Sequence, residues 1–174
     1  MKISEIASAA LKAMFNNRTC TKATLAINAG GAATVRTTGA TIYLIDGVYY
    51  TKAALAAQSI AVTHRFNGDA VTTADPAYVQ PQNSTVIYVL ALNAAGTVAV
   101  VQGSYAGQAI TFSTDLSKVF TGAGGVPNLP AGYVPFGAIK VVTGATTFTP
   151  GTTLLDAANV TATYFDLAHL PESL

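Results

Sequence analysis

The sequence predicts a mainly β protein, an antiparallel β-sandwich or barrel (jelly-roll-like) with a short N-terminal α-helix. The spacing of apolar residues changes from a helical period to strict alternation near Lys22. Beyond that point, short runs rich in β-branched and aromatic residues are separated by Gly, Asn, Asp and Pro at close intervals. No long helical pattern alternates with these runs, as it would in a βαβ fold, so antiparallel pairing is expected.

The N-terminal segment carries the only clear helical pattern, over roughly residues 3–16. Apolar residues recur three and four positions apart, which places them on one helical face: Ile3, Ile6, Ala7, Ala10, Leu11, Met14 and Phe15. Asn16-Asn17 then offers a stop. This face could dock on the core of its own domain or on a neighbouring subunit, and the sequence leaves both destinations open.

The rest of the chain is expected to form strands. Their ranges are Ala23–Asn28, Ala33–Thr37, Thr41–Ile45, Val48–Thr51, Ser59–Thr63, Thr85–Leu92, Val98–Gln102, Ile110–Thr114, Gly137–Val142 and Val160–Phe165. A chain of 174 residues suits one domain of ordinary size. We therefore expect an N-terminal helix or arm over residues 1–21 and a single β-rich domain over residues 22–174.

Turn residues support two hairpins and leave two segments irregular. Asp46-Gly47 suits the positive φ angles of a type I′ turn, and the Asn93–Thr97 loop has Gly96 available for a left-handed position. Ala53–Ala57 could make a single helical turn, although it lies between strands. Gly122–Pro135 is rich in Gly and Pro and is not expected to form a helix or a central strand.

Composition argues against several classes of partner. Charged residues make up 10% of the chain, against roughly 25% in ordinary soluble domains. The formal net charge is +1 and no Lys/Arg-rich run occurs, so nucleic acid and membrane are not expected as partners. The longest strongly apolar run, Val86–Leu92, is far shorter than the ~20 residues of a spanning helix. The single cysteine, Cys20, excludes an internal disulfide and fits synthesis in a reducing cytoplasm.

The ionisable residues do not form a motif for catalysis or metal binding. His64 and His169 have no second ligand at a metal-binding spacing. The aspartates stand where turns and caps explain them: Asp46, Asp69, Asp75 and Asp156. A pair brought together by folding, such as Asp69 with Asp75, stays open. No catalytic, cofactor or metal site is predicted, and the protein is not expected to be an enzyme.

Tyrosine is the most informative aromatic residue in the chain. With Gly, Thr, Asn and Gln it could build a sugar-binding surface, but tyrosines are also favoured in protein interfaces, and the chain has no Trp. A protein interface is the first hypothesis. The alternative is a glycan-binding module that uses loop tyrosines such as Tyr105 or Tyr133.

The C-terminal half carries loose motifs that point to a family. They are the hairpin Asn93–Gly103, the segment Leu129–Val141 and the segment Thr146–Leu154. This pattern resembles small virion structural proteins of tailed bacteriophages, including head decoration or cement proteins. The resemblance implies a non-enzymatic protein that binds the major capsid protein and copies of itself, as a trimer, on the capsid exterior after synthesis in the host cytoplasm. The alternative under the same resemblance is a tail or head fibre-type binding module that recognises a host surface glycan.

Two segments are candidates for contacts with other subunits. They are the N-terminal helix and the Gly122–Pro135 segment, which could form an ordered arm or, as an open alternative, an internal loop covering the end of the sandwich. The candidate interface residues are Ile3, Ile6, Leu11, Met14, Phe15, Val126, Leu129, Tyr133, Val134 and Phe136.

Overall fold

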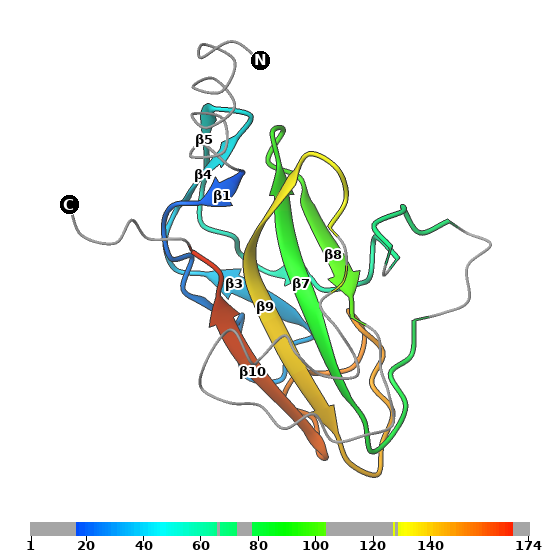
Figure 1. The fold of residues 1–174 in the computed structure, drawn as a ribbon. Helices are drawn as coiled ribbons and strands as arrows, with labels where there is room; N and C mark the ends of the chain where they lie inside the picture. The colour runs from blue at the N-terminus through cyan, green and yellow to red at the C-terminus, as the bar shows by residue number, and fades with distance from the viewer. Residues whose placement is uncertain (1–16, 66, 73–77, 104–126, 128, 169–174) are drawn as a thin grey trace.

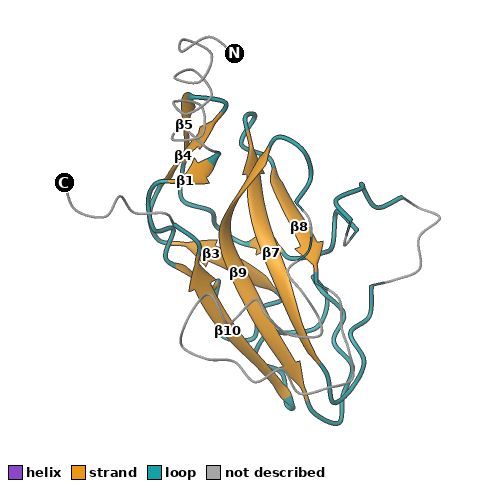
Figure 2. Cartoon of the chain, viewed as in Figure 1, coloured by secondary structure: helices purple, strands orange, loops and turns teal. Residues whose placement is uncertain are grey.

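The computed structural model describes residues 17–65, 67–72, 78–103, 127 and 129–168, and all regular structure among these residues is β (Figures 1 and 2). The strands are β1 (Arg18–Thr19), β2 (Leu25–Ile27), β3 (Thr34–Thr37), β4 (Thr41–Ile45), β5 (Val48–Lys52), β6 (Gln58–Ser59), β7 (Thr85–Asn93), β8 (Val98–Gln102), β9 (Tyr133–Thr143) and β10 (Val160–Asp166). They form three antiparallel sheets, which confirms the mainly β, antiparallel prediction.

The largest sheet has the strand order β10-β9-β7-β8. Strands β7 and β9 pair along almost their whole lengths, from Thr85 opposite Val142 to Asn93 opposite Tyr133. In Figure 1 the strands β7, β9 and β10 run side by side, and β3 crosses behind them. The other two sheets are smaller, with the orders β1-β4-β5 and β2-β3-β6.

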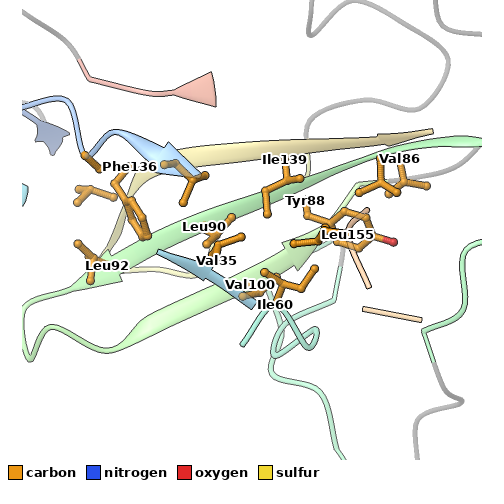
Figure 3. Packing of buried hydrophobic residues seen from close by; sticks show 14 of the residues in the cluster. Val35, Ile60, Val86, Tyr88, Leu90, Leu92, Val100, Phe136, Ile139 and Leu155 are labelled. Atoms are coloured by element: carbon orange, nitrogen blue, oxygen red, sulfur yellow. The ribbon is translucent and has the colours of Figure 1, made fainter. Parts of the chain in front are cut away.

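The main core lies between these sheets. Val86, Tyr88, Leu90 and Leu92 alternate along β7 and share one cluster with residues of the other sheets. Figure 3 shows Val35 of β3 gathered with Leu90 of β7 and Val100 of β8. The intervening residues Ile87 and Val89 point to the opposite face, where a second cluster includes Ala138 with Leu129, Phe165 and Leu167 around it. Strand β7 is therefore buried on both faces, which explains its nearly continuous apolar sequence.

Most predicted strands are present with small changes at their ends. The turn at Asp46-Gly47 has positive φ angles of 50° and 82°, and Gly96 has a φ of 74°, so both hairpin predictions are confirmed. Of the predicted strand Ser59–Thr63, only Ser59 lies in a strand, at the end of β6. Beyond it the Thr63 hydroxyl accepts the backbone N–H of Val100 at 2.9 Å, which replaces a ladder hydrogen bond. Ala53–Ala57 contains no helical turn, and Ala57 has a φ of 53°.

The prediction for Gly122–Pro135 was wrong at its C-terminal end. Tyr133, Val134 and Pro135 belong to β9, which lies between β10 and β7. A register shift explains how proline is tolerated in this strand: Leu90 pairs with Gly137 but Ala91 pairs with Pro135, so Phe136 is the extra residue of a bulge. The pairing of β9 with β10 begins only at Gly137, so Pro135 has no ladder partner on that side.

Other predictions either missed a strand or concern residues that the structure does not describe. Strand β1 was not predicted. The N-terminal helix over roughly residues 3–16 and the strand Ile110–Thr114 lie outside the described residues, as do residues 122–126 and 128 of the Gly122–Pro135 segment.

Candidate assembly surface

Strands β4 and β5 form a hairpin that carries most of the large exposed apolar residues. Its sheet lies beside the end of the long sheet at which β9 begins, and β5 forms its edge (Figure 2). Tyr49 is 62% exposed, Val48 51% and Ile42 38%. Among the described residues, the only other large hydrophobic residues that are exposed are Val79 and Leu154.

The alternation of side chains gives the hairpin two different faces. Tyr43 and Ile45 belong to the main core, so Ile42 and Leu44 point to the opposite, outer face. Cross-strand pairing places Thr51 beside Ile42 and Tyr49 beside Leu44 on that face. On the other side of β4, Arg18 of β1 is opposite Leu44.

The inner face of the hairpin is tied to the large sheet by side-chain hydrogen bonds. The hydroxyl of Tyr43 donates to the backbone oxygen of Asn93 at 2.9 Å, and the hydroxyl of Thr19 donates to that of Pro135 at 2.7 Å. The rings of Tyr43 and Tyr50 stack with centroids 5.6 Å apart. Burial, and secondarily the nearby Tyr50, raise the pKa of Tyr43, so its hydroxyl stays a donor at neutral pH.

The tip of the hairpin is fixed by local backbone chemistry. Asp46 and Gly47 take the left-handed conformations that a two-residue turn requires. The N–H of Asp46 donates to Oδ1 of Asn17 at 2.7 Å, so the residue before β1 is held at the tip. The exposed apolar residues therefore belong to a short hairpin that hydrogen bonds hold at its tip and on its inner face.

The residues predicted as an interface separate into groups. Ile3, Ile6, Leu11, Met14, Phe15 and Val126 lie outside the described residues. Val134 and Phe136 have 0% exposure in the core of their own domain, and Leu129 packs against the second cluster. In the single chain, Val134 and Phe136 thus have no surface to offer another subunit.

Tyr133 is partly buried and makes contacts within the chain. Its ring meets that of His64 edge to face, with centroids 5.6 Å apart, and its hydroxyl accepts Nδ2 of Asn93 at 3.1 Å. Burial lowers the pKa of His64, whose Nδ1 is 2.9 Å from the Thr63 hydroxyl. These contacts hold the start of β9 against the loop that contains His64.

The described aspartates occupy structural positions. Oδ2 of Asp69 accepts a hydrogen bond from Nδ2 of Asn67 at 2.7 Å. The backbone oxygen of Asp69 accepts the backbone N–H of Arg65. Asp156 accepts the N–H of Gly31 at 2.7 Å. Asp75, the proposed partner of Asp69, lies outside the described residues. Within the part of the chain that the structure describes, no group of three or more His, Cys, Asp or Glu residues could hold a metal ion.

Comparisons add no relatives to this description. No protein-family model, curated protein or solved structure matched the chain. Among the described residues, no helix is long and apolar enough to cross a membrane.

Sequence reasoning located the β4–β5 hairpin but not its exposure. The run Val48-Tyr49-Tyr50 is as apolar as the strands of the core. The position of this run at the edge of a sheet depends on the tertiary fold and not on local sequence. The polar residues Thr51 and Lys52, which follow the run directly, are the sequence feature that could have indicated its exposure.

Proposed function

We propose that this protein is a non-enzymatic virion structural protein of a tailed bacteriophage, a capsid decoration protein that binds the major capsid protein lattice and stabilises the head. The observation that carries the proposal is the β4–β5 hairpin with its exposed Val48 and Tyr49. Strand β5 lies at the edge of its sheet, where unpaired backbone groups and apolar side chains can pair with another chain. The resemblance of the C-terminal half to phage virion proteins supplies the kind of partner.

A charge-poor chain suits this role. With charged residues at only 10%, little electrostatic repulsion opposes close packing of neighbouring copies. On a capsid, weak contacts are repeated by symmetry, and each subunit held in place raises the effective concentration of the next contact. Apolar side chains such as Tyr49 would then be covered by neighbours.

The rest of the proposal combines the resemblance with the composition and apolar pattern of the sequence. The protein is made in the host cytoplasm, binds as a trimer to the capsid exterior and requires no cofactor, nucleic acid or membrane. Its sheets form the layers of a jelly-roll-like sandwich, with the N-terminal residues as an additional helix. Binding only to the assembled shell shifts the equilibrium away from disassembly, which is the source of the stabilisation.

The proposal is tested by reconstitution on phage heads that lack this protein. The purified chain should bind saturably, in hundreds of copies, and should raise the temperature at which the heads release their DNA. Val48→Lys and Tyr49→Lys should weaken binding, because each places a charge in the contact. Thr161→Lys is the matched control, since it adds the same charge to an exposed position on the edge strand β10.

Several results would overturn the proposal. One is failure of the purified chain to bind any head preparation, and another is equal binding by the Tyr49 and Thr161 variants. Saturable binding to host glycans that is lost in Tyr133→Ala, without any effect on head stability, would indicate the fibre-type module instead. Turnover of a glycan, peptide or nucleic acid that is lost on changing Asp69 would indicate an enzyme.

A further inference from the structure

The outer face of the β1-β4-β5 sheet is apolar and continues beyond the hairpin itself. The N–H of Cys20 donates to the backbone oxygen of Ile42 at 2.8 Å, which extends the β1–β4 register and places Cys20 beside Ile42. The face therefore contains Cys20, Ile42, Leu44 and Tyr49, with Arg18 and Thr51 at its sides. We call all six residues together the outer face.

Leu44 shows that the centre of the outer face is covered. Its side chain points away from the main core and belongs to neither core cluster, yet it is 0% exposed. Its neighbours within the sheet are Arg18 and Tyr49, and Tyr49 is itself 62% exposed. Neighbouring side chains on one face of a sheet project side by side and leave the space above them open, so we infer that another part of the same chain covers Leu44.

The path of the chain indicates which part reaches this place. Strand β1 runs antiparallel to β4, so the chain before Arg18 approaches from the tip of the hairpin. The bond between Asn17 and the N–H of Asp46 holds it there. The segment before Asn17 is therefore connected to the hairpin at its tip, where Asp46 is two residues along the chain from Leu44.

Those residues have the pattern that fits an apolar sheet face. The apolar positions of residues 3–15 form one helical stripe, with Ser4, Glu5, Ser8 and Lys12 on the opposite side. A helix over these residues would be about 20 Å long at ~1.5 Å per residue. A strand such as β4 spans about 17 Å at ~3.3 Å per residue, so the two lengths match.

We propose that residues 3–16 dock as an amphipathic helix on the outer face of their own chain, with Leu11, Met14 and Phe15 covering Leu44 and packing against only part of Ile42. The short connection through Asn17 gives this segment a high effective concentration at its own hairpin, which favours it over the segment of another copy. The docking does not depend on the proposed virion function. It leaves Tyr49 and Val48 free at the edge, where the assembly contact is placed.

The single cysteine provides a probe for this docking. Cys20 lies on the outer face and is partly buried, so its reaction with a small disulfide reagent should report whether the face is covered. The double variant Leu11→Asp/Phe15→Asp should increase the reaction rate several-fold. The matched control Ser4→Asp/Ser8→Asp adds the same charge to the opposite side of the helix and should leave the rate unchanged.

Circular dichroism at 222 nm gives a second test that does not alter the N-terminal segment. Isolated helices shorter than ~12–15 residues are marginal in water, so undocking should melt this one. Leu44→Ser should therefore reduce the helical signal to that of a chain lacking residues 2–15. An unchanged signal in Leu44→Ser, or an unchanged Cys20 rate in the apolar-face variant, overturns the proposal.

Protein concentration separates docking within one chain from docking between copies. Protection of Cys20 should be the same over a wide range of dilution, because the contact is intramolecular. Protection that disappears on dilution would show that the segment binds a second copy, and this would overturn docking on its own chain. Loss of head binding in the Tyr49 variant, with Cys20 protection retained, would show that the two proposals are independent.

Discussion

The hydroxyl of Tyr43 donates a hydrogen bond to the backbone oxygen of Asn93 at 2.9 Å and so joins the β4–β5 hairpin to the end of β7. Asn93 also accepts the N–H of Thr97 with its Oδ1 and donates from Nδ2 to the hydroxyl of Tyr133. One residue therefore connects the β7–β8 loop, the start of β9 and the hairpin that carries the exposed apolar residues. The position of the candidate assembly surface depends on this junction.

Replacing Tyr43 by Phe should lower the free energy of unfolding by about 0.5–1.5 kcal/mol, the usual net value of one hydrogen bond. Tyr50→Phe is the matched control, because its ring stacks on Tyr43 but no hydrogen bond of its hydroxyl occurs among the described residues. Urea denaturation of both variants measures the difference. Equal effects would show that the Tyr43–Asn93 bond adds nothing to stability.

Much of the fold could be predicted from sequence because its signals are local. Asp46-Gly47 and the alternation along Thr41–Ile45 define a hairpin without reference to the rest of the chain. Strand β1 could not be predicted, because Arg18-Thr19 is too short for any periodicity and pairs with β4 through tertiary contacts. Pro135 argues against a central strand, yet it lies in β9, because a bulge that no sequence pattern reveals removes the need for a backbone N–H at this position.

The candidate site was less predictable than the fold. Val134 and Phe136 look like loop residues beside Gly132 and Pro135, yet they fill the main core. Conversely, Tyr49 resembles a core residue and is exposed. Local sequence gives the type of each side chain, but which face of a sheet meets another sheet is decided by long-range packing.

Two glycines with nearly the same backbone conformation should differ strongly in their tolerance of alanine. Gly132 and Gly151 have φ angles of 76° and 77°. A Cβ at Gly132 has nothing within 4 Å, whereas a Cβ at Gly151 would lie 2.9 Å from both the backbone nitrogen and the Cβ of Ala61. Gly132→Ala should cost about 1–2 kcal/mol from the left-handed conformation alone. Gly151→Ala should cost about 1–3 kcal/mol more through overpacking, and thermal unfolding of the two variants measures the gap.

Tyr164 should make the protein less stable at alkaline pH. Burial, and then the negative charge of Asp156, raise its pKa to about 12 from an ordinary value of 10.0. Between these pH values the folded state holds a proton that the unfolded state has released, so the free energy of unfolding falls as pH rises. Below pH 10 the residue contributes no pH dependence. Urea denaturation from pH 9 to 12 should show a shallower decline in Tyr164→Phe than in the unchanged chain, and identical slopes would contradict the raised pKa.

Two buried glutamines should respond in opposite ways to replacement by methionine. Nε2 of Gln80 donates to the backbone oxygens of Ser84 and Val141, and its Oε1 accepts the hydroxyl of Tyr88 at 3.1 Å. Gln102 is only 4% exposed, and among the described residues neither its Nε2 nor its Oε1 has a hydrogen-bond partner.

Gln80→Met removes bonds that connect the chain before β7 to β9, so it should cost about 1–3 kcal/mol. Gln102→Met removes an unpaired buried amide and keeps a similar volume, so it should be neutral or stabilising by up to about 1 kcal/mol. Urea denaturation midpoints with unchanged slopes would establish both values. A loss of stability in Gln102→Met as large as that in Gln80→Met would contradict this prediction. It would show that the Gln102 amide is hydrogen-bonded in solution, for example to a buried water molecule. Only an amide with hydrogen-bond partners loses bonding free energy when it is removed.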